Sequence, residues 1–235
     1  MPKRVVLIRH GDDPGDDPGD DRVVGYFRAR NIEPEICRPF KGEALGEVDG
    51  SLAASVVYGG PFNVFETERH RFLNHEHRWI EQCMARDVPL LGICQGAQSI
   101  AHVLGAHVGP KPGEPHEFGY YPIRPTGAGK GLFPGELHVC QSHFHEFAIP
   151  AGAELLASSD VFANQAMRYG ARTYGFQFHA EVTRAGFRCW QNRDRAPWGK
   201  PGVQTREQQD RLGEAHDQAQ HDWFLGFLDK LFSGI

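Results

Sequence analysis

Short runs of strand-forming residues alternate with longer segments along the first part of the chain, up to Gly105. The runs lie at Arg4–Ile8, Glu35–Arg38, Ser55–Tyr58 and Pro89–Ile93. Short apolar runs with β-branched residues are typical of strands buried in a parallel sheet. Residues 22–31 and 72–86 are predicted to be helices, the second because its apolar side chains recur at the helical period. This alternation predicts an α/β fold with an open, mostly parallel central sheet that helices flank.

The sequence changes character beyond Gly105, where glycine, proline and histidine become frequent. Proline interrupts helices and central strands, so residues 117–124 and 137–147 are predicted to form an antiparallel extension of the sheet. From about residue 183 we expect a helical C-terminal extension whose last helix spans Asp217–Phe232. The apolar stripe of that helix favours packing against the sheet, and a face for a partner or a homodimer is the alternative.

Length and composition narrow the classes of function. A chain of 235 residues suits one large α/β domain, and we predict a single domain over residues 1–235. The net charge of −5 and the lack of a Lys/Arg-rich run argue against a nucleic-acid partner. The apolar runs are far shorter than the roughly 20 residues that cross a membrane, and five scattered cysteines favour neither disulfides nor zinc. We expect a cytoplasmic protein that acts on small molecules or proteins.

The clearest candidate chemistry lies in the segment Gly92-Ile-Cys94-Gln-Gly96, which joins the strand after Pro89 to a helical pattern. Small residues two positions before and after a central residue are typical of the strand-turn-helix elbow that presents a nucleophile. At such a turn the backbone N–H groups and the helix dipole favour a thiolate, which is the attacking species. We therefore expect Cys94 to be a nucleophile.

Two further segments supply what a cysteine nucleophile needs. The segment Arg172–Val182 is predicted to be a strand that carries His179 and Glu181, and residues two apart on a strand share a face. The carboxylate of Glu181 would then orient the ring of His179, which completes the three parts of a nucleophilic triad. The Gly59-Gly60 pair ends another strand, and glycines let a backbone N–H approach a ligand closely.

Together these motifs resemble the class I glutamine amidotransferases, which use a Cys-His-Glu triad. The resemblance rests on Gly-x-Cys-x-Gly-x-Gln at 92–98, Gly-Gly-Pro at 59–61 and Phe-His-x-Glu at 178–181. It implies a flavodoxin-like fold, with Cys94 as the nucleophile, His179 as the general base and acid, and Glu181 as the residue that orients His179. It also implies that the backbone N–H groups of Gly60 and Gln95 form the oxyanion hole.

The same resemblance implies three substrate contacts. Gln98 would hold the amino-acid end of glutamine, and Ser142 and His143 match the position where the backbone in this family contacts that end. Two residues depart from the family pattern: Ala180 stands where proline is common, and Phe144 stands where glycine is common.

The function that these residues predict is hydrolysis of glutamine to glutamate and ammonia through a γ-glutamyl thioester on Cys94. No cofactor and no metal are expected. The ammonia would pass to a separate synthase subunit, such as one that makes GMP. The segment around Phe144 is closer to stand-alone members of the superfamily, including γ-glutamyl peptidases, so hydrolysis of γ-glutamyl peptides or amines by the same triad is the alternative. A non-catalytic binding protein that keeps the fold is a third hypothesis.

Other motifs carry weaker signals. Asp-Asp-Pro-Gly occurs twice in tandem within residues 12–19; an acidic solvated loop is favoured over a calcium loop, because the D-x-D-x-D-G pattern and the closing Glu are missing. Gly127–Gly131 lacks the pattern of a phosphate-binding loop and opens no helix in the sequence pattern. His143, His145 and Glu146 form a polar cluster whose spacing does not choose between a ligand set, a base and loop residues.

Overall fold

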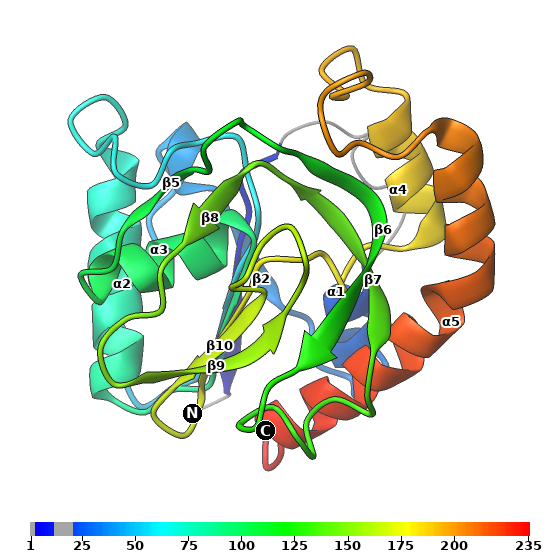
Figure 1. Ribbon diagram of the computed structural model, residues 1–235. Coiled ribbons are helices and arrows are strands. Elements are labelled where there is room, and N and C mark those ends of the chain that lie inside the picture. Colours follow the sequence, from blue (N-terminus) through cyan, green and yellow to red (C-terminus); the bar gives the residue numbers. More distant parts are fainter. Residues whose placement is uncertain (1–2, 12–20) are drawn as a thin grey trace.

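The computed structural model describes residues 3–11 and 21–235. Within these ranges, nine strands form one central sheet (Figure 1). In chain order they are β1 (Arg4–Ile8), β2 (Glu35–Cys37), β3 (Leu52–Val57), β4 (Leu90–Ile93), β6 (Glu117–Pro125), β7 (Leu137–His143), β9 (Ala153–Ser158), β10 (Ala166–Tyr169) and β11 (Thr173–Phe176). A separate two-stranded sheet pairs β5 (Val108–Pro110) with β8 (His145–Phe147).

The central sheet has a parallel and an antiparallel half. Its spatial order is β2-β1-β3-β4-β11-β10-β9-β6-β7. The strands from β2 to β11 pair in parallel, and those from β10 to β7 join through antiparallel pairs. The predicted fold, a parallel sheet with flanking helices and an antiparallel extension, is confirmed.

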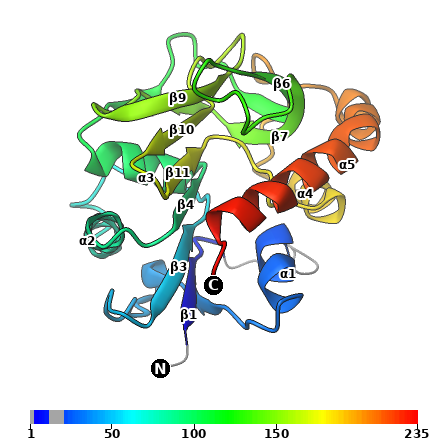
Figure 2. The same ribbon diagram turned by 90° about the horizontal axis from the view of Figure 1, so that it is seen from below.

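Helices cover both faces of the parallel half. They are α1 (Arg22–Arg28), α2 (Phe72–Ala85), α3 (Gln95–Val103) and the C-terminal part of α5 (Arg206–Leu231), whereas α4 (Arg184–Gln191) packs against β6 and β7. Figure 2 shows α2 and α3 on one face and α1 and α5 on the other. Because side chains alternate along a strand, Val5 and Leu7 belong to the core under α1 and α5, and Val6 and Ile8 to the core under α2 and α3. None of the helices in the described ranges is long and apolar enough to cross a bilayer.

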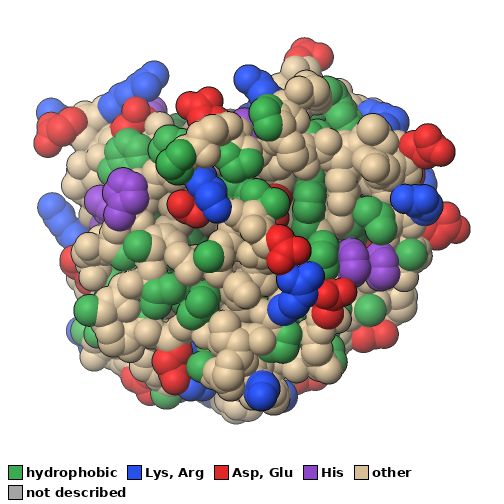
Figure 3. Space-filling view, viewed as in Figure 1, with side chains coloured by type: hydrophobic (Ala, Val, Ile, Leu, Met, Phe, Trp, Pro, Cys, Tyr) green, Lys and Arg blue, Asp and Glu red, His purple; other side chains and the backbone are tan. Residues whose placement is uncertain are grey.

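The surface carries both signs of charge. Figure 3 shows Lys and Arg side chains next to Asp and Glu, dispersed among hydrophobic side chains on one face. Arg124, for example, forms ion pairs with Glu136 at 2.9 Å and with Asp160 at 2.6 Å. Exposed pairs of this kind contribute at most about 1 kcal/mol each, so they bear on solubility more than on stability.

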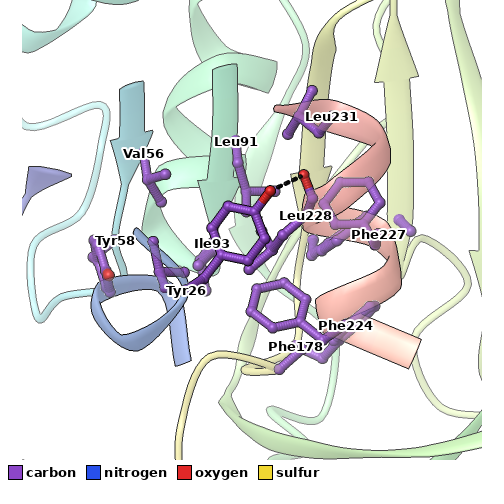
Figure 4. Close-up of a cluster of buried hydrophobic side chains, with 14 of the residues drawn as sticks. Tyr26, Val56, Tyr58, Leu91, Ile93, Phe178, Phe224, Phe227, Leu228 and Leu231 are labelled. Atoms are coloured by element: carbon purple, nitrogen blue, oxygen red, sulfur yellow. Dashed lines mark hydrogen bonds between the residues drawn. The ribbon is translucent and has the colours of Figure 1, made fainter. Parts of the chain in front are cut away.

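The C-terminal helix α5 is part of the core. Phe224, Phe227 and Leu228 are buried in the cluster that also contains Tyr26 of α1 (Figure 4). The Tyr26 hydroxyl donates a hydrogen bond to the Leu228 carbonyl at 3.3 Å. The apolar stripe of this helix therefore packs against the sheet, as predicted, and the alternative of a partner face is wrong for these residues.

Several boundaries differ from the predictions. Helix α5 begins at Arg206 and not at Asp217, because Thr205 and Gln208 form a capping box that starts the helix earlier. The predicted strand 137–147 is divided at Phe144, since β8 leaves the main sheet to pair with β5. Strand β11 ends at Phe176, well before Val182, because its parallel partner β4 turns into α3 at Cys94.

Candidate active site

The backbone turns sharply at Cys94, between β4 and α3. Cys94 has φ 50° and ψ −108°, a conformation that residues with a side chain rarely adopt and that is held only by the surrounding structure. The two flanking glycines make the turn possible. A Cβ at Gly92 would lie 2.5 Å from the carbonyl oxygen of Gly96, and one at Gly96 would lie 1.9 Å from that of Val57. The predicted elbow is thus present, with its thiol at the N-terminus of α3.

His179 and Glu181 lie in the segment that follows β11. The prediction that a strand presents them is wrong, and three hydrogen bonds, one with Cys140 and two with Arg22, hold the segment instead. The His179 N–H donates to the Cys140 carbonyl at 2.8 Å, and the Arg22 N–H donates to the Glu181 carbonyl at 2.9 Å. The Arg22 guanidinium donates to the Ala180 carbonyl at 3.0 Å. The start of α1 therefore fixes the position of the histidine and the glutamate.

The two side chains form a buried, charge-assisted pair. His179 Nδ1 lies 2.7 Å from Glu181 Oε1, and both residues are buried. Burial disfavours a charged ring, but the Glu181 carboxylate and the Cys94 sulfur outweigh it and raise the pKa of His179 to about 10. An imidazolium next to the sulfur stabilises a thiolate. The arrangement can therefore supply both a nucleophile and a proton donor at neutral pH.

The Gly59-Gly60 turn lies against both His179 and Cys94. A Cβ at Gly59 would lie 2.8 Å from His179 Cε1 and 3.3 Å from Cys94 Cβ. A Cβ at Gly60 would lie 2.7 Å from Gln95 Oε1, so the two residues predicted to form an oxyanion hole are neighbours. Only glycine fits at either position, because a side chain would collide with His179 at Gly59 and with His10 and Gln95 at Gly60.

Gln98 reaches the thiol through a residue that the sequence analysis did not single out. Gln98 Nε2 donates to Gln177 Oε1 at 3.2 Å, and Gln177 Nε2 donates to Cys94 Sγ at 3.6 Å. Gln177 is fully buried. The available signal was its position, a polar amide in an apolar strand end two residues before His179.

Ser142 and His143 have different surroundings. The Ser142 carbonyl oxygen lies 3.9 Å from Cys94 Sγ, so its backbone borders the thiol. The ring of His143 is directed elsewhere: Nε2 lies 3.0 Å from Glu117 Oε2, and Nδ1 lies 3.0 Å from the His145 carbonyl. The next residue, Phe144, is 42% exposed.

The other sequence candidates are not part of this site. Within the described ranges, no group of three or more His, Cys, Asp or Glu side chains is arranged to hold a metal ion. Residues 12–20 of the Asp-Asp-Pro-Gly repeat lie outside the described residues. No helix follows Gly127–Gly131, and a Cβ at Gly129 would lie 1.9 Å from the Leu156 carbonyl oxygen, so this segment is packed against β9.

Comparisons with known proteins agree with this geometry. The family model described as glutamine amidotransferase class-I matches residues 21–188. The chain belongs to this family. Among curated relatives of this amidotransferase, the glutamine amidotransferase-like protein YfeJ of Salmonella typhimurium is 34% identical over 154 residues, 62% of this chain and 64% of that protein. The glutamine-hydrolyzing GMP synthase of Porphyromonas gingivalis is 28% identical over 193 residues, 76% of this chain and 36% of the synthase.

Solved structures extend the similarity to the whole amidotransferase chain. A glutamine amidotransferase from Thermotoga maritima superposes with a TM-score of 0.87 at 27% sequence identity and covers 100% of both chains. An amidotransferase from Methylobacillus flagellatus has the same TM-score at 22% identity, which shows a shared fold. The C-terminal helices α4 and α5 thus belong to the part that these structures share.

Proposed function

We propose that this amidotransferase hydrolyses the side-chain amide of glutamine through a γ-glutamyl thioester on Cys94. The observation that carries the proposal is the contact of the Gly59-Gly60 turn with both Cys94 and His179. This contact supports the proposal because it sets the turn that would supply the backbone donor against the residues that would act as nucleophile and proton carrier, and Glu181 lies 2.7 Å from His179.

Acylation would follow from this charge arrangement. The Cys94 thiolate attacks the amide carbon, and the carbonyl oxygen takes up the negative charge. The N–H groups of Gly60 and Gln95 stabilise that oxyanion, each worth about 3 kcal/mol of barrier in comparable sites. His179 then donates its proton to the amide nitrogen as the C–N bond breaks, which leaves ammonia and the thioester.

Deacylation uses the same groups in reverse roles. His179, now neutral, takes a proton from a water molecule that attacks the thioester carbon. The C–S bond breaks, glutamate is released, and the Cys94 thiolate and the charged His179 are restored. Gln98 and the backbone at Ser142 and His143 would hold the amino-acid end of the substrate during both steps.

The ammonia would be used by a separate synthase. Several curated relatives are named GMP synthases, and this chain spans only about a third or less of their length. A synthase subunit that docks on the amidotransferase and accepts ammonia is therefore the partner that we propose.

The test is an assay of ammonia and glutamate release from glutamine, run on the purified protein and on the complex recovered from its native cell. Cys94→Ala should abolish release, and acid quenching of the wild type should trap a γ-glutamyl adduct on Cys94 by mass spectrometry. The matched control is Cys189→Ser, because Cys189 is a partly exposed thiol on α4 and should leave the rate unchanged. An unchanged rate in Cys94→Ala would refute the proposal.

One observation favours a second candidate, hydrolysis of γ-glutamyl peptides or amines. Phe144 is 42% exposed and stands between Ser142 and His145, whose carbonyls contact Cys94 Sγ and Gln98 Nε2. Its ring packs on His145, with centroids 4.4 Å apart, and on His116 at 5.0 Å. An exposed aromatic group two positions after the residue whose carbonyl borders the thiol suits the side chain of a larger leaving amine.

The two candidates separate by substrate. Glutamine and a γ-glutamyl dipeptide with an apolar second residue would be compared on the wild type and on Phe144→Gly. If the second candidate holds, the dipeptide is the better substrate and Phe144→Gly lowers its kcat/KM by about tenfold, the loss expected for one aromatic contact. Equal effects of Phe144→Gly on both substrates would remove this candidate.

A further inference from the structure

A second buried histidine lies on the other side of the Gly59-Gly60 turn. His10 follows β1, and its side chain is completely buried. Its Nε2 atom lies 3.0 Å and 2.9 Å from the two carboxylate oxygens of Glu76 on α2, which is also fully buried. Its Nδ1 atom lies 3.3 Å from the Gly59 carbonyl oxygen. A carbonyl oxygen can only accept, so Nδ1 donates the hydrogen bond to Gly59, and Nε2 lies within hydrogen-bond distance of the Glu76 carboxylate.

His10 contacts one part of the turn, and Cys94 and His179 contact another. A Cβ at Gly59 would meet His179 and Cys94, whereas a Cβ at Gly60 would lie 2.4 Å from His10 Cβ. The turn therefore runs between His10 and the reacting groups. His10 is itself held by aromatic neighbours, with the rings of Phe62 and Phe72 each 6.2 Å away.

The bond to Gly59 has a geometric consequence for Gly60. The Gly59 carbonyl and the Gly60 N–H belong to one peptide plane, and in a trans peptide these two bonds point in opposite directions. All peptide bonds in the described ranges are trans. A carbonyl anchored on His10 therefore directs the Gly60 N–H away from His10.

The turn needs such an anchor because of its composition. A peptide between two glycines rotates with little steric penalty, and larger residues do not fit at either position. Rigidity has to come from neighbours. Gln95 holds the next part of the loop, since its Oε1 accepts the Phe62 N–H at 2.8 Å, and His10 holds the carbonyl of Gly59.

We propose that His10, held by its hydrogen bonds to Glu76, is a positioning residue that fixes the Gly59-Gly60 peptide so that the Gly60 N–H stays directed at the oxyanion. This inference rests on the proposed function, in which that N–H stabilises the oxyanion. His10 touches neither substrate nor thiol and acts through the orientation of one peptide.

Two substitutions separate the two bonds of His10. In His10→Asn the amide nitrogen takes the place of Nδ1, so the bond to Gly59 is kept and the one to Glu76 is lost. In His10→Gln the amide nitrogen takes the place of Nε2, so the bond to Glu76 is kept and the one to Gly59 is lost. Each variant keeps one contact of the ring and loses the other, and His10→Asn should be the less stable of the two because it leaves the buried Glu76 carboxylate without its partner.

The proposal predicts different kinetics for the two variants. His10→Gln should lower kcat by about 10- to 100-fold with KM nearly unchanged, because an oxyanion donor acts in the transition state. His10→Asn should stay within about threefold of the wild type. The rate at which iodoacetamide alkylates Cys94, measured in a Cys189→Ser background, should be the same in all three proteins, because alkylation needs a thiolate and no oxyanion hole. Equal losses of kcat in both variants, or a parallel loss of alkylation, would overturn the proposal.

Crystal structures keep the test independent of turnover. The Gly59 carbonyl should keep its direction in His10→Asn and rotate in His10→Gln, and the reverse result would overturn the proposal. If the variants do not fold, the wild type is treated with the γ-aldehyde analogue of glutamine, which forms a tetrahedral adduct on Cys94. The adduct oxygen should then lie about 3 Å from the Gly60 nitrogen with Gly59 still bound to His10; a carbonyl that has left His10 contradicts the proposal. A wild type that turns over neither substrate defeats the proposed function alone, since the carbonyl direction still decides this inference.

Discussion

The buried pair of His179 and Glu181 and the buried pair of His143 and Glu117 differ in what surrounds them. His179 and Glu181 are 2.7 Å apart, and His143 and Glu117 are 3.0 Å apart. In the second pair the polar side-chain atoms all have hydrogen-bond partners: Glu117 also accepts from Gln165 at 2.9 Å and from Ser159 at 3.1 Å. The second nitrogen of His143 faces the carbonyl of His145, whereas His179 lies against Cys94, a sulfur that can lose its proton.

The difference teaches that distance and burial do not identify a catalytic pair. A polar network in which all groups are satisfied rigidifies a core, and this is what Glu117 does between β6, β7 and the loop that carries Ser159. Glu181 is less completely bonded, because its Oε2 has no hydrogen-bond partner among the described residues. The hypothesis that His179 is catalytic therefore depends on which atom lies against its ring on the side away from Glu181. Five substitutions can break or sharpen this contrast.

The largest effect is expected at His179. His179→Asn should lower kcat by about 10⁴-fold or more, because both proton transfers and the charge that favours the thiolate are lost. His143→Asn should cost less than about tenfold, because its ring serves packing and hydrogen bonding. Both rates are measured as ammonia release, with folding checked by circular dichroism. Similar losses of kcat in His179→Asn and His143→Asn would show that the two histidines do not differ in function.

Glu181→Gln should lower kcat by about 10³-fold, since the amide no longer stabilises a charged ring. It should also lower the pKa of His179 from about 10, followed by NMR titration of the ring. The raised pKa means that the pair contributes stability fully below pH 6.5 and loses it as the pH rises towards 10. The variant should therefore show a weaker decline of stability between pH 7 and 10, and a His179 pKa that stays at about 10 would count against the assigned cause.

Glu117→Gln addresses the other pair and should act on stability. The buried carboxylate accepts three hydrogen bonds, and breaking such a group costs about 3 kcal/mol of unfolding free energy. Urea unfolding measures the change, and kcat of the folded fraction should fall by less than about tenfold. A loss of kcat as large as that of Glu181→Gln, without a loss of stability, would contradict a structural role.

The smallest effect is expected at Gln177, the amide between Gln98 and the thiol. Gln177→Met keeps the volume and removes both hydrogen bonds, which are worth about 1 kcal/mol each. We expect KM for glutamine to rise by about tenfold, because Gln98 loses its anchor, with a smaller change in kcat. Steady-state kinetics with glutamine and with the γ-glutamyl dipeptide measure KM and kcat. An unchanged KM for glutamine would show that Gln177 does not belong to the site.

The sequence predicted the parts whose signal is local. The strand of Arg4–Ile8, the helix at 72–86 and the elbow at Cys94 follow from periodicity and from the two glycines, because those residues fit few other conformations. The spacing of His179 and Glu181 identified the pair, although the reason given, a shared strand face, was wrong. Arg22 holds that segment from 158 positions away, and no local pattern reports such a contact.

Contacts between distant segments also account for what was missed. His10 and Glu76 are 66 positions apart in the chain, and Gln177 and Cys94 are 83 apart; each is an ordinary polar residue until the sheet places it next to its partner. The hairpin of β9 and β10 was not predicted, because its strands are short and depend on the pairing with β11 and β6.

The glycines of the elbow bear on how tolerance to mutation is interpreted in this protein. Gly92 and Gly96 leave no room for a methyl group, so in a saturation scan they should be as intolerant as Cys94, although neither reacts with the substrate. Thiol labelling would separate the two kinds of intolerance. An alanine at Gly96 removes the geometry and, with it, the folded protein, whereas an alanine at Cys94 leaves a folded protein that carries one reactive thiol fewer.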